Sequence, residues 1–294
     1  MNLSAVLDHA FEPLTQAWSW RDAALYALAL GIGSDPLDAD ELPYVYEGRK
    51  PADPAHRVRT VPSFCVTLGW LPFWQDDPRF GIAWQRIVHG ELAFTLHAPL
   101  LAEGSVRAMH RLVSVRDKGA ARGAVVHVDK ELHDARTGAL LASVRSVEFL
   151  RDDGGCGSWG EARESLAPLP ADFSPTLQVD YATSRQAALL YRLASGDPMP
   201  IHADPAIARG AGFERPISHG VHNLGLACRA VLKHVLPGLP QALRGMAVRF
   251  VQPGYPGDTV RVELQRRGDV VHFRARALER DAWLLDRGTA QLGD

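Results

Sequence analysis

The stretch that decides the fold is Gly220-Val-His-Asn-Leu-Gly-Leu-Ala-Cys-Arg-Ala-Val-Leu-Lys-His-Val235. Its apolar side chains recur three and four residues apart, which is the period of a helix with one buried face. Pro237 and Gly238 follow directly and would end such a helix. We therefore expect one long helix over residues 221–235.

Strand-like segments follow this helix. They alternate in places between apolar and polar residues and are separated by turn signals such as Arg267-Gly268-Asp269. The segments are Ala247–Val251, Thr259–Leu264, Val270–Ala275 and Trp283–Leu285. A helix followed by an antiparallel meander belongs to the α+β class.

The first half of the chain echoes the second half in three places. The echoes are Ala23–Gly31 with Ala187–Gly196, His89-Gly90 with His219-Gly220, and Pro99–Arg107 with Pro253–Arg261. Their common order predicts two copies of one domain. Each copy should contain a short amphipathic helix, a longer apolar helix and then strands. The first-half strands are expected within residues 106–115, 124–132 and 139–150.

Glycine and proline cluster between the two halves, at Asp152–Ser158 and Ala167–Pro170, as they do in linkers. The predicted domains are therefore residues 1–160 and 172–294. A long helix wrapped by a curved antiparallel sheet is a hotdog, so the predicted fold is an α+β double hotdog, with two tandem domains.

Asp197 and His202 belong to the densest polar cluster of the chain. Pro198 and Pro200 prevent a regular helix between them, so both side chains could point into one cleft and share a water molecule. Taken alone, Asp197 is a common turn residue and His202 is a common structural histidine.

The surrounding motif resembles a known family. Tyr191-x-Leu-x-Ser-Gly-Asp197-x-x-Pro-Ile-His202-x-Asp-Pro205, followed by Gly212-Phe-x-x-Pro-Ile-x-His219-Gly220, resembles the MaoC-like dehydratases. It is most similar to the R-specific (type 2) enoyl-CoA hydratases. Residues 22–33, 44–47 and 88–91 resemble the first hotdog of the two-domain members.

This resemblance implies reversible hydration of trans-2-enoyl-CoA to (3R)-3-hydroxyacyl-CoA. Such a reaction needs a base for the water, an acid for Cα and a donor for the thioester oxygen. The resemblance gives the first two roles to Asp197 and His202. It gives the third to the N–H of Gly220, at the positive end of the long helix. It implies an acyl-CoA substrate and no cofactor.

The resemblance also implies substrate contacts by Tyr191, Met199, Ser218 and His219. We expect His219 to brace its loop with a hydrogen bond rather than to perform chemistry. Met199 departs from the pattern, because the family usually carries Asn at this position. The first half has no Asp-to-His pair of this kind, and we interpret it as a degenerate copy that shapes the acyl pocket.

Two other functions stay open. A hotdog thioesterase would hydrolyse the thioester, but such enzymes generally place a carboxylate on or near the long helix, and Val221–Val235 contains none. A non-catalytic acyl-CoA-binding protein would be compatible with Met199. No metal is expected, because the spacing of His202, His219 and His222 with Asp197 fits no familiar zinc motif. Gly31-Ile-Gly33 lacks the third glycine of a dinucleotide fingerprint.

The composition excludes several classes of partner. The 294 residues carry a net charge of −2 and no run of five like charges, so nucleic acid and anionic membranes are not expected partners. Three cysteines stand far apart in the sequence, which suits a reducing compartment. The N-terminus lacks the pattern of a signal peptide. We expect a cytoplasmic protein, either a monomer or a homodimer.

Overall fold

The structure is a computed structural model that describes residues 1–48, 58–161 and 163–293. Its first half begins with helix α1 (Leu3–Leu7), strand β1 (Leu14–Trp18) and helix α2 (Trp20–Ala29). Short 3-10 helices follow: η1 (Leu42–Tyr44), η3 (Pro62–Val66), η4 (Trp74–Asp76), η5 (Pro78–Phe80) and η6 (Trp84–Arg86). Four strands complete this half: β2 (Ile87–Leu96), β3 (Gly104–Asp117), β4 (Ala124–Asp134) and β5 (Leu140–Leu150).

The second half follows a similar plan. It comprises strand β6 (Leu177–Ala182), helix α3 (Ala187–Ser195), the 3-10 helix η7 (Pro200–His202), and helices α4 (Pro205–Gly210) and α5 (Gly220–His234). After η8 (Pro240–Ala242) come four strands: β7 (Leu243–Phe250), β8 (Thr259–Arg267), β9 (Val270–Ala277) and β10 (Ala282–Leu292).

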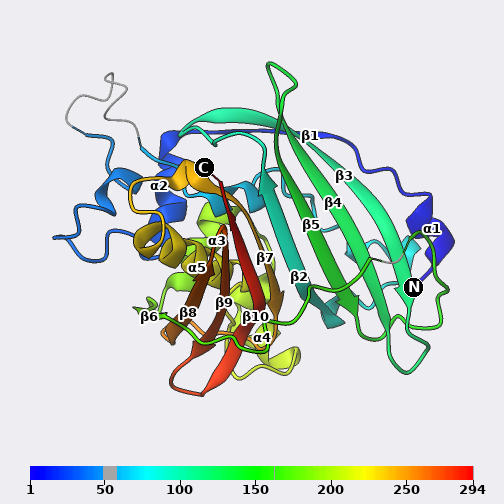
Figure 1. Ribbon diagram of the computed structural model, residues 1–294. Coiled ribbons are helices and arrows are strands. Elements are labelled where there is room, and N and C mark those ends of the chain that lie inside the picture. The colour runs from blue at the N-terminus through cyan, green and yellow to red at the C-terminus, as the bar shows by residue number, and fades with distance from the viewer. Residues whose placement is uncertain (49–57, 162, 294) are drawn as a thin grey trace.

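All of the strands form one antiparallel sheet. Its ten strands run in the order β1-β3-β4-β5-β2-β7-β10-β9-β8-β6, so each half contributes five neighbouring strands in an equivalent order (Figure 1). The two halves join where β2 pairs with β7, with Ala93 opposite Ala247 near the middle of the pairing. This order is the one that two copies of a domain give when they are placed edge to edge; the exact domain ranges stay a prediction.

Helix α5 lies against the sheet of the second half. It packs on β7, β8, β9 and β10, and twelve of its fifteen residues are buried. The predicted helix over 221–235 is thus confirmed, with an observed start at Gly220. Figure 1 shows the curved second-half strands around α5 and α3.

The two halves also meet through helices α2 and α3, which are equivalent in the two copies. The ring centroids of Tyr26 and Tyr191 are 5.7 Å apart, and both rings are fully buried. These two tyrosines occupy matching places in the first sequence echo. The second half is therefore packed against the first half before its polar loop begins.

Two expectations for the first half are wrong. Within its described residues the longest helix is α2, and no counterpart of α5 is present; the segment between α2 and β2 carries Pro36, Pro43, Pro62, Pro72 and Pro78, which interrupt helices. His89-Gly90 lies inside strand β2, whereas His219-Gly220 starts α5, so that echo does not mark equivalent positions.

No helix in the described part of the chain has the length and apolar character needed to cross a membrane.

Candidate active site

Asp197 is held by the turn that ends α3. The helix stops at Ser195, and Gly196 adopts a left-handed conformation with φ of 73°, which glycine reaches at little cost. The backbone N–H of Asp197 then donates to Ser195 Oγ at 3.3 Å. Its carboxylate Oδ1 accepts a hydrogen bond from the N–H of Met199 at 2.9 Å. Asp197 is only 7% exposed, so it is an acidic group held in the interior.

His202 lies at the end of the 3-10 helix η7, between two proline-containing turns. Its Nδ1 is 2.8 Å from the carbonyl oxygen of Ile217. A carbonyl only accepts hydrogen bonds, so Nδ1 must carry the proton. In the neutral imidazole Nε2 is then a free acceptor, and in the protonated form it becomes a donor. The sequence did not identify Ile217 as the residue that orients this ring.

His219 completes the polar group. Its ring stacks on that of His202 with centroids 3.6 Å apart and planes inclined by 23°. Its Nε2 lies 3.7 Å from Asp197 Oδ2. Neither ring nitrogen has a hydrogen-bond partner among the described residues. The expected bracing hydrogen bond from this side chain is therefore wrong, and stacking holds the ring in place.

Burial controls the protonation of the site. It raises the pKa of Asp197, an effect that the adjacent His202 partly reverses. It lowers the pKa of His202, an effect that Asp197 partly reverses. Because the two groups act on each other directly, they titrate as a coupled pair, and between its two titration steps this pair holds one proton. A pair with one proton contains one acid and one base.

Burial also lowers the pKa of His219, and the neighbouring His202 and His222 lower it further. This ring is therefore neutral at physiological pH. It separates the Asp197–His202 pair from the ring of Tyr191, whose centroid is 4.9 Å from that of His219. His219 thus forms an uncharged wall of the site.

Gly220 brings a backbone donor to the same place. It is the first residue of α5, with His219 as N-cap, so its N–H has no partner inside the helix and lies at the positive end of the dipole. A Cβ atom at this position would be 2.9 Å from Cδ1 of Phe250. A larger residue at this position would therefore force the Phe250 ring or the start of α5 to shift. The N–H of Ser218 fixes the preceding turn by donating to the carbonyl of Gly254 at 2.8 Å.

The cluster has the atoms for a metal ion but a poor geometry for one. Asp197, His202 and His219 offer ligand atoms within 4.8 Å of one another. However, the His202 and His219 rings stack with their planes inclined by only 23°, so their in-plane lone pairs lie in nearly parallel planes, whereas a metal needs converging ligands. The arrangement suits proton transfer better than coordination.

The other predicted substrate contacts lie at different depths. Met199 is partly buried between Asp197 and η7, and Ser218 is buried beside His219. Tyr191 is fully buried behind His219, in the core. The structure thus brings Asp197, His202, His219 and Gly220 together. Contact of Tyr191, Met199 and Ser218 with a substrate stays a prediction.

Comparison with known proteins defines the class. The MaoC like domain matches residues 170–282, and the MFE-2 hydratase 2 N-terminal domain matches residues 17–152. The chain is 32% identical to the peroxisomal enoyl-CoA hydratase 2 of Arabidopsis thaliana, over 97% of this chain and 93% of the relative. It is also 32% identical to an enoyl-CoA hydratase of Mycobacterium tuberculosis, over 91% and 90% of the two chains. The chain belongs to the MaoC-like hydratases of the enoyl-CoA hydratase 2 type.

Solved structures agree on the fold. A MaoC-like dehydratase from Phytophthora capsici superposes with a TM-score of 0.83 at 27% identity, and each chain is covered completely. A Mycobacterium tuberculosis protein described as having a double hotdog fold superposes with a TM-score of 0.57 at 17% identity, over 97% of both chains. The predicted α+β double hotdog is confirmed.

Proposed function

We propose that this protein hydrates trans-2-enoyl-CoA thioesters reversibly to (3R)-3-hydroxyacyl-CoA. The observation that carries the proposal is the buried Asp197–His202 pair, located beside the free N–H at the start of α5. Relatives of this chain from Arabidopsis thaliana and Mycobacterium tuberculosis are named enoyl-CoA hydratases. Another relative from Mycobacterium tuberculosis is named a 3-hydroxyacyl-thioester dehydratase. Hydratase names the addition of water and dehydratase names its removal, which are opposite directions of one reaction.

The pair can supply both proton transfers. Asp197 as carboxylate takes a proton from water while the water oxygen forms a bond to Cβ. His202 is protonated at Nε2 and donates its Nε2 proton to Cα. The Gly220 N–H donates to the thioester oxygen while negative charge grows there. Afterwards Asp197 holds the proton and His202 is neutral, so transfer of one proton between them restores the starting state.

The thioesterase alternative lacks its usual carboxylate. Helix α5 contains no Asp or Glu, and Asp197, whose Oδ2 lies 3.7 Å from Nε2 of the N-cap residue His219, comes from the loop after α3. The binding-protein alternative rests on Met199. The Met199 backbone, however, already donates to Asp197, so the carboxylate is oriented without an Asn side chain.

One assay separates these functions. The purified protein is incubated with crotonyl-CoA, while enoyl absorbance and free thiol are followed together. Hydration predicts a loss of absorbance without thiol release. Thiol release would show a thioesterase, and no change in either signal would leave a binding protein. Chiral analysis of the product then tests the (3R) configuration.

We further propose that the first half shapes the acyl pocket. The buried 3-10 helix η3 packs against α5, β2 and β5, where a second long helix would otherwise lie. Monomer and homodimer both stay open. A cytoplasmic location stays a prediction, since relatives from Arabidopsis and Drosophila are named peroxisomal.

A further inference from the structure

One face of α5 is bound to the other half of the chain. Four of its residues, spaced three or four apart, face the end of α2 and the loop that follows it: His222, Gly225, Arg229 and Lys233. We call this face the α2-facing stripe. It starts two residues after Gly220, on the helix that carries the proposed oxyanion donor.

The stripe caps the C-terminal end of α2. His222 Nε2 lies 3.1 Å from the carbonyl oxygen of Ala29, and Arg229 Nη1 donates to the carbonyl oxygen of Leu30 at 3.1 Å. These carbonyls belong to the last turn of a helix, where partners inside the helix run out. A Cβ at Gly225 would come within 2.3 Å of Leu30 Cδ2, so the two helices are in direct contact.

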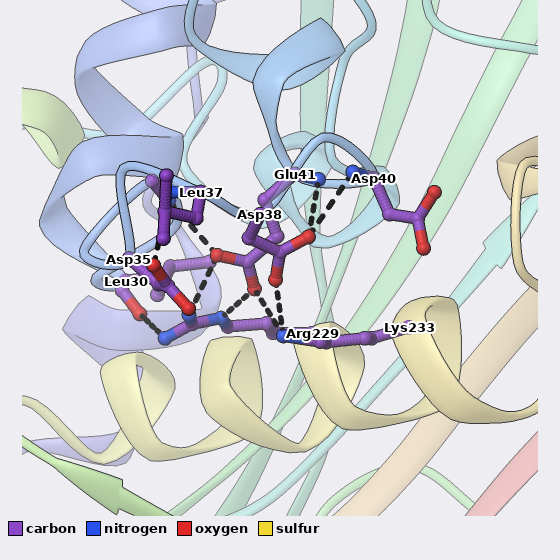
Figure 2. A network of polar contacts seen from close by, with 9 residues as sticks. Leu30, Asp35, Leu37, Asp38, Asp40, Glu41, Arg229 and Lys233 are labelled. Carbon is purple, nitrogen blue, oxygen red and sulfur yellow. Dashed lines mark hydrogen bonds and ion pairs between the residues drawn. The ribbon is translucent and has the colours of Figure 1, made fainter.

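Arg229 and Glu41 form the centre of the network (Figure 2). Arg229 Nε and Nη2 donate to the two carboxylate oxygens of Glu41 at 2.6 and 2.7 Å. The same carboxylate accepts the N–H of Gly33 at 2.9 Å. Glu41 is 4% exposed and Arg229 is 7% exposed. A buried, bidentate pair of this kind fixes geometry, because losing one partner leaves an unpaired charge in the interior.

The remaining contacts enclose the Arg229 side chain. Its guanidinium lies 4.5 Å from the ring centroid of Tyr181, on the second-half strand β6. Lys233 forms an ion pair with Asp38 and lies 3.8 Å from Glu41, at the more exposed rim. Thus the loop after α2, the C-terminal end of α2 and strand β6 all contact the Arg229 side chain of α5.

We propose that Glu41 and Arg229 are positioning residues of the hydratase, which set the position of α5 along its own axis and thereby place the Gly220 N–H. This inference rests on the proposed function. Nine residues separate Arg229 from Gly220, about 13 Å of helix at 1.5 Å per residue. A helix transmits an axial shift along its length. A misplacement of about 1 Å at a reacting centre can cost on the order of 100-fold in rate.

The test compares two ion pairs that join the same two halves, each of which contains a buried glutamate. We call the Glu41–Arg229 ion pair the clamp, and Glu41→Gln and Arg229→Lys each perturb it. Glu91→Gln is the matched control: Glu91 is 6% exposed and accepts from Arg249 Nε at 2.9 Å and from Leu166 N at 3.1 Å. Its neighbours Leu92 and Val248 enter the core, so the Glu91–Arg249 pair lies on the opposite face of the sheet from α5.

We expect each clamp variant to lower kcat for crotonyl-CoA by about 10-fold, with KM changed less than about 2-fold. Glu91→Gln should lower Tm but leave kcat unchanged. A purely structural role predicts the same kcat for the clamp variants and the control at equal folded fraction, and that result would overturn the proposal. Arg229→Lys, which keeps the charge, provides a second test if Glu41→Gln folds poorly.

A spectroscopic readout separates this inference from the function itself. In an Asp197→Asn background, bound 2,4-hexadienoyl-CoA should absorb at longer wavelength, because the thioester carbonyl is polarised by its hydrogen-bond donor. Adding Glu41→Gln should reduce that red shift, whereas adding Glu91→Gln should not. An unchanged shift with Glu41→Gln contradicts the clamp. Failure of the wild-type protein to hydrate crotonyl-CoA would instead refute the proposed function.

Discussion

His202 and Ile217 are joined by a hydrogen bond of 2.8 Å between Nδ1 and the backbone carbonyl. This bond fixes both the tautomer and the direction of the imidazole, and it leaves Nε2 as the reactive nitrogen. Because an acceptor-only group binds Nδ1, the ring can gain or lose its second proton only at Nε2. The proposed acid, His202, is thus oriented by the backbone of Ile217, whose side chain has no reactive group.

His202→Ala should lower kcat for crotonyl-CoA hydration by roughly 100-fold or more, as expected when a general acid or base is removed. His97→Ala is a suitable control, since the His97 side chain is exposed and contacts Ser143 Oγ at 2.9 Å. Steady-state kinetics on both variants test this. Near wild-type turnover in His202→Ala would exclude the proposed acid.

Gly220→Ala should lower kcat on the order of 10-fold, because the added methyl group meets Phe250 and would displace the N–H that we propose as the donor to the thioester oxygen. Gly210→Ala is the matched control, as a Cβ there meets nothing within 4 Å. The prediction is checked with kcat for both variants. Equal activity in both would show that the start of α5 does not contribute the donor.

Met199→Asn should raise kcat on short enoyl-CoA substrates by a few-fold. A thioether cannot donate a hydrogen bond, whereas an Asn amide could provide a second donor near the shared water. The backbone of residue 199 already orients Asp197, so we expect a modest gain. Kinetics on a series of acyl chain lengths measure it. A fall in activity on every substrate would instead indicate that Met199 shapes the acyl pocket.

Acid should destabilise the fold partly through His222. Burial lowers the pKa of His222 to about 4, so between its unfolded pKa of about 6.5 and 4 the unfolded chain binds the extra proton and the folded chain does not. Stability from this group is complete above pH 6.5 and is lost as pH falls toward 4. His222→Gln keeps a donor for Ala29 and should reduce proton uptake on unfolding by about one. Urea unfolding at several pH values measures this; an unchanged slope would contradict it.

The parts of the fold and site that depend on a local sequence pattern could be predicted. The spacing of Leu224, Val231 and their neighbours predicted α5, and the prolines around Met199 placed Asp197 and His202 on one loop. The partners Ile217 and Glu41 could not be found in this way, because a backbone carbonyl has no signature and Glu41 lies 188 residues from Arg229. The missing first-half helix could have been noticed from the prolines between residues 36 and 78, which break helical periodicity.

The most direct measurement is the turnover of Asp197→Asn on crotonyl-CoA. The isosteric amide keeps the volume of the side chain but cannot accept a proton from water. We predict a folded protein whose kcat is lower by at least about 100-fold, with no thiol release in either protein. A variant that stays folded and hydrates crotonyl-CoA at a near wild-type rate would contradict the assignment of Asp197 and His202 as the catalytic pair.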